Sequence, residues 1–235
     1  MLEGIWAVVP AAGVGSRFTG AGAKASKPYP KQYLRIGEKT VLEHSLAVLC
    51  AHPKIVGVML ALDANDAHWP KLAELNGKPI CVCTGGQTRA ESVQSALAML
   101  LQMGVAAKTL VVVHDAARPC LRHADLDAVL AAASNDAVGA VLAIPVRDTV
   151  KRSDTGLGVL ETLDRSEIWA AQTPQVFRLG PLARAIAQFP AATDESQAME
   201  QSGLTPKLVM GRASNLKITV ADDLALAAFY LGLAV

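Results

Sequence analysis

Three short segments carry residues that could bind phosphate or stabilise charge, and each follows an apolar run. The first is a loop of small residues, Pro10 to Gly15, that ends beside Arg17. Small side chains leave backbone N–H groups open to a ligand, and an arginine stays charged at every physiological pH. We interpret this loop as a cradle for a nucleotide triphosphate. An ordinary glycine-containing turn has the same composition and is the alternative.

The other two segments hold polar residues at the ends of predicted strands. One contains Gly86 and Gln87, where a strand meets the start of a helix. The other, residues 114–119, places Asp115 and Arg118 directly after a buried strand. An aspartate there could hold a metal or a sugar hydroxyl, and an arginine could bind phosphate through two N–H groups. A plain turn in the first case and a salt bridge that closes the loop in the second are the alternatives.

Two better-known phosphate-binding patterns are absent from the sequence. The dinucleotide pattern G-x-G-x-x-G fails because Phe18 stands at the third glycine position. The pattern G-x-x-x-x-G-K-[ST] does not occur anywhere in the chain. The first loop is therefore neither a good dinucleotide fingerprint nor a P-loop.

The composition limits the class of partner. The chain has 235 residues, of which 51% are hydrophobic, enough to build a sizeable core. Aromatic residues make up 4% and the net charge is +1, which disfavours a nucleic-acid binder that stacks bases or neutralises a polyanion. Positive charge is concentrated locally, however, because residues 1–31 contain four basic residues against the single acid Glu3. That local excess of charge suits a phosphate group. A solvated loop rich in lysine has the same composition and is the alternative.

The sequence also predicts a cellular location. Apolar runs are too short for a membrane span, and the first residues have no basic segment typical of a signal peptide. The four cysteines lack the spacing of zinc ligands and are interpreted as reduced, buried thiols. We therefore expect a cytoplasmic protein with no membrane partner.

Strand and helix patterns alternate through residue 144. Apolar runs predict strands at residues 5–9, 55–62, 79–84, 110–113 and 137–144. Helical patterns begin at Thr40 and Thr88, each with a glutamate three residues later, and are also expected at residues 65–75 and 125–133. This alternation predicts an α/β fold: a Rossmann-like, mostly parallel sheet with helices on both faces. Because ligands bind at the carboxyl ends of such strands, the three polar segments should form one site.

The second half departs from this alternation. Residues of the polar stretch at about 146–170 predict a β-arm that protrudes from the domain and needs cover, most simply from a second subunit. Further helices are expected at 179–189, from Thr193 to Gln201 and at 222–234, and strands at 208–210 and 216–220. We expect one domain, residues 1–235, plus the arm.

Eight motifs in order identify a resemblance that covers essentially the whole chain. They are residues 10–17 (PAAGVGSR), 30–34 (PKQYL), 85–92 (GGQTRAES), 114–119 (HDAARP), 145–149 (PVRDT), 173–175 (TPQ), 193–195 (TDE) and 215–217 (NLK). The sequence resembles the 2-C-methyl-D-erythritol 4-phosphate cytidylyltransferases. The resemblance implies the nucleotide-diphospho-sugar transferase type of fold, and transfer of a cytidylyl group from CTP to methylerythritol phosphate with release of pyrophosphate.

The resemblance also implies roles for individual residues. Catalytic cations would be Arg17, Lys31 and Lys217. CTP would be bound by Pro10, Ala11, Ala12, Gly13, Gly15, Gly86, Gln87, Ser92, Asp115 and Ala116. The sugar phosphate would be bound by Asp115, Arg118, Thr149, Arg165, Thr193 and Lys217, with Arg165 supplied by the partner subunit. It implies a divalent cation, usually Mg²⁺, and a homodimer with interlocking arms.

Two departures and two rivals accompany the resemblance. The segment Thr19 to Pro30 is longer than expected, and Gln87 stands where a carboxylate is common. A ribitol 5-phosphate cytidylyltransferase is the nearest rival, but its first loop is typically richer in glycine and it typically lacks Thr193-Asp194-Glu195. A non-catalytic nucleotide sensor is the other rival, and it would not need Arg17, Lys31 and Lys217 together.

Overall fold

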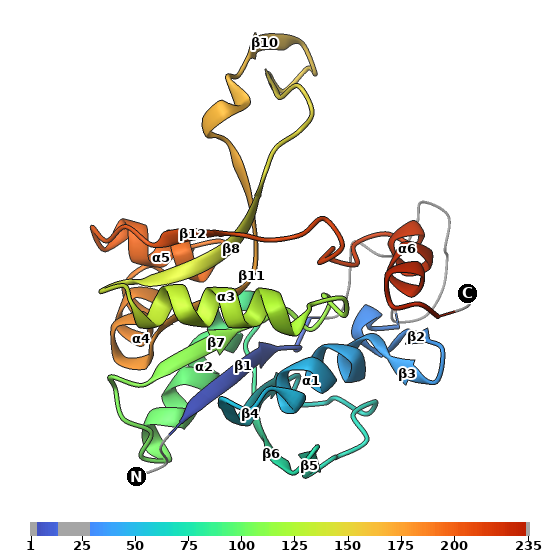
Figure 1. Cartoon of the computed structure of the whole chain (residues 1–235), viewed down its shortest axis with the longest axis vertical. Helices are drawn as coiled ribbons and strands as arrows, with labels where there is room; N and C mark the ends of the chain where they lie inside the picture. Colours follow the sequence, from blue (N-terminus) through green and yellow to red (C-terminus); the bar gives the residue numbers. More distant parts are fainter. Residues whose placement is uncertain (1–3, 14–28, 234–235) are drawn as a thin grey trace.

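The chain folds around one eight-stranded, mostly parallel sheet (Figure 1). The computed structural model describes residues 4–13 and 29–233. In spatial order, the strands are β12 (Lys207–Met210), β8 (Gly139–Pro145), β11 (Trp169–Arg178), β7 (Leu110–Val113), β1 (Ile5–Pro10), β4 (Ile55–Leu62), β6 (Lys78–Thr84) and β5 (Glu74–Leu75). Strands β11 and β5 run antiparallel to their neighbours, and the remaining pairs are parallel. The predicted α/β class is confirmed.

Helices cover both faces of this sheet (Figure 1). One face packs against α1 (Val41–Ala51) and α3 (His123–Ser134), and the other against α2 (Arg89–Gln102), α4 (Leu179–Gln188) and α5 (Glu195–Gln201). Along β1, Ala7 and Val9 belong to one apolar cluster, and Trp6 and Val8 belong to the other. A strand covered on both sides must be apolar throughout, which explains its unbroken apolar run.

A third, smaller cluster lies beside the main sheet. Helix α6 (Asp222–Tyr230) packs near the hairpin of β2 (Arg35–Ile36) and β3 (Lys39–Thr40). Ile36, Val41 and Ile218 are buried together there. The short 3₁₀ helix η1 (Lys31–Tyr33) precedes β2, and this cluster therefore supports the segments that carry the lysines of the site.

Two predicted helix starts are confirmed in detail. Thr40 caps α1 and Thr88 caps α2, and in each case the glutamate three residues later bonds back to the backbone of the capping threonine. Such reciprocal capping satisfies N–H groups that the first helical turn leaves without partners. It also orients the start of α2 directly beside the Gly85–Gly86 loop.

The predicted helix at residues 65–75 is wrong. The chain there forms turns and then β5. The cause is local: Asp63 accepts a hydrogen bond from the Asn65 N–H, and Asp66 accepts hydrogen bonds from the N–H groups of His68 and Trp69. Aspartates that bond the backbone in this way compete with helix formation.

Other elements in the second half also differ from prediction. The segment at residues 216–220 is not a strand. The helix expected from Thr193 to Gln201 begins at Glu195, with Asp194 as its cap. The long strand β11 was not predicted, because Pro174 interrupts its pattern. The ladder between β11 and β8 shifts register between Ala171 and Gln175, so the proline lies where pairing is interrupted.

The predicted arm is present. Residues between β8 and β11 rise away from the sheet and form the hairpin of β9 (Lys151–Ser153) and β10 (Val159–Thr162), followed by the 3₁₀ helix η2 (Arg165–Glu167) (Figure 1). Every residue of both hairpin strands is exposed. In the part of the chain that the structure describes, no helix is long and apolar enough to cross a membrane.

Candidate active site

A cavity of about 520 Å³ opens at the carboxyl ends of β1, β6 and β7. Its wall brings together eleven of the predicted site residues: Pro10, Ala11, Ala12, Gly13, Lys31, Gly86, Gln87, Ser92, Asp115, Ala116 and Lys217. These come from segments that are far apart in the sequence. The expectation that the three polar segments meet at one edge of the sheet is confirmed.

The remaining predicted residues are either off this cavity wall or outside the described part of the chain. Arg118, Thr149, Arg165 and Thr193 are not on the cavity wall. Thr149 and Arg165 belong to the arm, where the guanidinium of Arg165 donates to the carbonyl of Arg147. Gly15 and Arg17, and the unusually long segment up to residue 28, lie outside the described residues.

The first wall of the cavity is the small-residue loop after β1, and a buried glutamine supports it. Gln32 donates from its side-chain amide to the carbonyl of Ala11 at 2.8 Å and to that of Gly13 at 3.1 Å. Its side chain comes from η1, so the loop is held by the helix that carries Lys31. The sequence analysis did not single out Gln32; the signal was a polar residue inside the Pro30–Leu34 motif.

The second wall is the loop that connects β6 to α2. The N–H of Gly86 donates to Ser92 Oγ at 3.1 Å, and the N–H of Gln87 donates to the Glu91 carboxylate at 2.7 Å. A Cβ added to Gly85 would lie 2.6 Å from the Cβ of Ala12, closer than real Cβ contacts come. Glycine is therefore required for the first and second walls to touch.

Asp115 is the centre of a charged cluster on the third wall. Its Oδ1 accepts from Arg89 Nε at 2.9 Å, and its Oδ2 lies 2.9 Å from Lys217 Nζ and 3.6 Å from Arg118 Nε. Burial alone would raise the pKa of Asp115, but the charges of Arg89, Lys217 and Arg118 lower it well below its ordinary value of 3.8. The carboxylate is therefore an anion at neutral pH.

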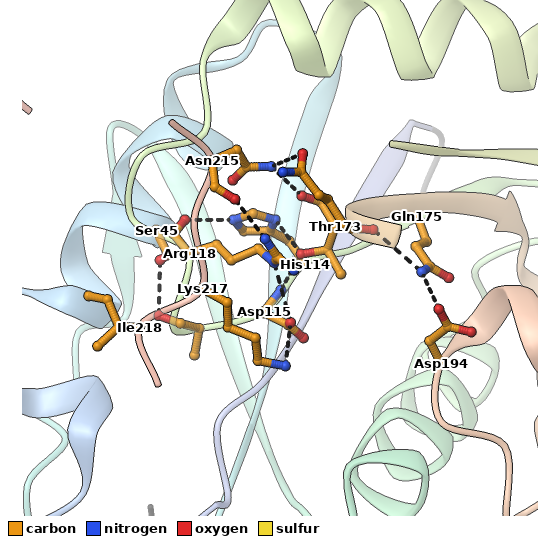
Figure 2. Close-up of polar contacts among 12 residues, drawn as sticks. Ser45, His114, Asp115, Arg118, Thr173, Gln175, Asp194, Asn215, Lys217 and Ile218 are labelled. Atoms are coloured by element: carbon orange, nitrogen blue, oxygen red, sulfur yellow. Dashed lines mark hydrogen bonds and ion pairs between the residues drawn. The ribbon is translucent and has the colours of Figure 1, made fainter. Parts of the chain in front are cut away.

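A buried hydrogen-bonded network of His114 and Thr173 holds the backbone of Asp115 (Figure 2). His114 Nε2 is 3.0 Å from the carbonyl of Arg118, so that nitrogen carries the proton. His114 Nδ1 then accepts from the Thr173 hydroxyl at 3.0 Å, and the hydroxyl oxygen accepts the N–H of Asp115 at 3.0 Å. Burial lowers the pKa of His114 to about 4, so the imidazole is neutral.

Arg118 is part of this buried support. Its Nη1 donates to the carbonyl of Asn215 at 2.6 Å, and Asn215 in turn donates to the carbonyl of Thr173 at 2.8 Å (Figure 2). The salt bridge to Asp115, which was the alternative reading of this pair, is therefore present. Phosphate binding by Arg118 stays a prediction, since the structure places the side chain beneath the cavity wall.

The two described lysines converge on one side of the cavity. Lys31 Nζ donates to the carbonyl of Ile218 at 2.6 Å, directly after Lys217 in the chain. The N–H of Ile218 donates to the carbonyl of Ala117 at 2.9 Å, which fixes this segment against the Asp115 loop. Three cations, Lys31, Lys217 and Arg89, and the carboxylate of Asp115 thus line a cavity with backbone loops of small residues. This arrangement is suited to a polyphosphate.

Comparison with known proteins decides the family. A family model for 2-C-methyl-D-erythritol 4-phosphate cytidylyltransferase matches residues 5–233. The chain belongs to this cytidylyltransferase family. The sequence is 47% identical over 227 residues to 2-C-methyl-D-erythritol 4-phosphate cytidylyltransferase of Pseudomonas fluorescens strain Pf0-1, covering 95% of this chain and 94% of that protein. It is also 47% identical to the enzyme of the same name from Xanthomonas axonopodis pv. citri, covering 96% and 83%.

Solved structures agree with this assignment. A crystal structure described as 4-diphosphocytidyl-2C-methyl-D-erythritol synthase superposes with a TM-score of 0.81 at 37% identity, covering 97% of this chain and 99% of that one. The Francisella tularensis 2-C-methyl-D-erythritol 4-phosphate cytidylyltransferase gives a TM-score of 0.80 at 31% identity, covering 97% and 100%. The mostly parallel sheet is therefore the fold of the cytidylyltransferase family.

Within this cytidylyltransferase fold, two charged residues were missed by the sequence analysis. Arg89 contacts Asp115 and also binds Glu195 through two N–H groups, at 2.7 Å and 3.0 Å. The available signal was its position: Arg89 lies in the first turn of α2, where the helix dipole disfavours a cation. A cation in such a place needs nearby carboxylates, and Glu195 begins α5 at a position that supplies one.

Proposed function

We propose that this protein transfers the cytidylyl group of CTP to 2-C-methyl-D-erythritol 4-phosphate. The products are pyrophosphate and 4-diphosphocytidyl-2-C-methyl-D-erythritol, a precursor in the non-mevalonate route to isoprenoids. The observation that carries the proposal is that Lys31, Lys217 and Asp115 meet the two small-residue loops in one cavity, in a chain that belongs to the cytidylyltransferase family over residues 5–233.

The residue types suit an in-line displacement at the α-phosphorus. The attacking atom is a phosphate oxygen of methylerythritol phosphate, which is already anionic and needs no general base. The barrier is the crowding of negative charge around phosphorus, so positioned cations supply the catalysis. Lys31 and Lys217 line the cavity and are proposed for this role. Arg17 is proposed as a third cation from its motif. His114 is neutral, buried and fully bonded within the protein, in keeping with a reaction that uses no histidine base.

A divalent cation, most simply Mg²⁺, is proposed as cofactor. Among the described residues, no group of three or more His, Cys, Asp or Glu side chains could hold a metal. Asp115 is the one acid on the described cavity wall, and cations already contact both of its oxygens. Mg²⁺ commonly binds through substrate phosphates with few protein ligands. The ion would therefore enter with the triphosphate of CTP and neutralise part of its charge.

A homodimer is proposed from the arm. A two-stranded hairpin is marginal in water without cover, and this one exposes Leu157, Val159 and Leu160, with Leu157 85% exposed. A second subunit would cover these side chains and bring Arg165 to the partner's cavity. Sedimentation velocity is expected to show dimers; a fully active monomer would exclude a shared site.

A cytoplasmic location is proposed as well, in keeping with four free cysteines.

A direct assay tests the substrate. Purified protein is incubated with CTP and either methylerythritol phosphate or ribitol 5-phosphate, and pyrophosphate release is followed. We expect turnover with methylerythritol phosphate, loss of turnover when a chelator removes divalent cations, and recovery when Mg²⁺ is added. Preference for ribitol 5-phosphate would overturn the substrate assignment, and CTP binding without turnover would favour a nucleotide sensor.

Gln32 provides a test of the first wall. Replacing Gln32 by glutamate would place a carboxylate against the carbonyl oxygens of Ala11 and Gly13, which Gln32 now holds. We expect the KM for CTP to rise about tenfold, the scale of losing one to two kcal/mol of hydrogen bonding, with a smaller change in the KM for methylerythritol phosphate. Gln102→Glu, an exposed change at the end of α2, is the matched control. An unchanged KM for CTP would show that the loop does not depend on Gln32.

A further inference from the structure

We propose that Glu195 and Arg89 are positioning residues for Lys217, acting through the carboxylate of Asp115. The inference rests on the proposed function, because it concerns the cation that stabilises the reacting phosphate. Four side chains of alternating charge run from the start of α5 to the cavity wall: Glu195, Arg89, Asp115 and Lys217. Glu195 is not on the cavity wall, whereas the other three line it.

Each contact in this series uses a different atom. Arg89 gives both Nη groups to Glu195, at 2.7 Å and 3.0 Å, and its Nε to Asp115 Oδ1 at 2.9 Å. Asp115 is thereby left with Oδ2 for Lys217 Nζ, at 2.9 Å. Since the two oxygens have separate partners, the carboxylate cannot rotate without breaking an ion pair. The orientation of Arg89 therefore determines where the ammonium of Lys217 is held.

The two ends of the series differ in exposure, from the buried Glu195 to the half-exposed Lys217. The side chain of Glu195 is 1% exposed, that of Arg89 is 25% exposed, and that of Lys217 is 39% exposed. A carboxylate as buried as Glu195 needs a cation, and a bidentate guanidinium contact restrains the orientation of both groups. The backbone of Asp115 is held separately by Thr173. The side chain of Asp115 is thus the part that Glu195 and Arg89 control.

Loss of the Glu195 charge should change how the ammonium of Lys217 is held. With Glu195→Gln, Arg89 keeps its charge and turns more strongly toward Asp115, the carboxylate that remains within reach. Asp115 then holds Lys217 less firmly and in a different position. Glu195 and Lys217 belong to one chain of contacting charges, so their substitutions should be non-additive. If Glu195→Gln only weakened the fold, it would lower activity by the same factor in the unsubstituted protein and in the Lys217→Ala background.

A double-mutant cycle tests the inference. In the otherwise unchanged protein, Glu195→Gln is expected to lower kcat/KM for methylerythritol phosphate about tenfold. In the Lys217→Ala background, the same change is expected to cost less than about twofold. Glu200→Gln, an exposed change on the same helix, is the matched control and should leave kcat/KM unchanged in both backgrounds. The cycle is repeated with the Kd of methylerythritol phosphate measured by calorimetry, which needs no turnover.

Arg89→Lys provides a second cycle should Glu195→Gln not fold. It keeps the positive charge but cannot contact both carboxylates through a planar fork, and the same coupling to Lys217 is expected. Equal effects with and without Lys217, for whichever variant folds, would overturn the inference and make the series purely structural. Absence of turnover in the unsubstituted protein would instead count against the proposed function, so the two failures are distinguishable.

Discussion

Replacing Lys217 by alanine is expected to lower kcat by about 10²–10³-fold, the scale of removing one preorganised electrostatic contact from a transition state. Lys217 Nζ is held 2.9 Å from Asp115 Oδ2 on the cavity wall, so its charge is in place before the substrate binds. Negative charge builds up around phosphorus during the displacement, and a fixed cation stabilises it without first having to move. Steady-state kinetics with CTP and methylerythritol phosphate measures the effect.

A matched lysine provides the control. Lys207 begins β12, is exposed and lies off the cavity wall, so Lys207→Ala should retain full activity. Lys217→Ala should also keep its folded structure, because its side chain is 39% exposed and its ion pair contributes less than a buried one. If Lys217→Ala turned over within threefold of the unsubstituted protein, the lysine would have no role in the chemical step.

Asp115→Asn is expected to destabilise the fold by about 3 kcal/mol and to lower activity together with stability. The side chain of Asp115 is 8% exposed and contacts Arg89, Lys217 and Arg118. Without its charge, Arg89 keeps only Glu195, and Lys217 and Arg118 lose the carboxylate that they contact. Arg118 is too buried for water to compensate. Urea denaturation measures the change. Asp63→Asn is an exposed change at a side chain with no ion pair to any described residue, and it should alter stability by less than about 0.5 kcal/mol.

The stability that the charge of Asp115 contributes should decrease as the pH is lowered. The three cations lower the pKa of Asp115 below its ordinary value of 3.8, despite burial. A group whose pKa is lower in the folded state stabilises the fold above its unfolded pKa, and that contribution is lost as the pH falls toward the folded pKa. The difference in unfolding free energy between the unsubstituted protein and Asp115→Asn should therefore be constant from about pH 8 to pH 5 and should shrink only below about pH 4. A difference that vanished at pH 6 would contradict the assignment.

Much of the fold could be predicted because its signals are local. The apolar runs at β1 and β4 indicate strands covered on both faces, and the capping boxes at Thr40 and Thr88 mark helix starts within four residues. Parallel strands place their carboxyl ends at one edge of a sheet, which is why the loops after β1, β6 and β7 could be expected to share a site. The predicted helix at residues 65–75 failed for a reason that is equally local but was overlooked, since its aspartates bond the backbone.

Only the tertiary structure could reveal β11 and its place between β8 and β7. Pro174 argues against a central strand, yet β11 lies between β8 and β7, because the ladder to β8 is interrupted where the proline falls. That interruption depends on where two strands far apart in the sequence meet. Pairing across such distances leaves no pattern within either segment.

For the site, too, some features could be predicted from the sequence and others could not. The sequence by itself predicted which segments line the cavity: the small-residue loop after β1, the glycines before α2, Asp115 and the lysines at 31 and 217. The tertiary structure decided how these groups are held. Gln32 reaches back to Ala11 and Gly13. Arg89 contacts both Asp115 and Glu195, and Glu195 is separated from Arg89 by 106 residues of sequence. Residue types determine what a group can do, whereas the partner of a buried charge is set by which side chains the folded core brings within hydrogen-bonding distance.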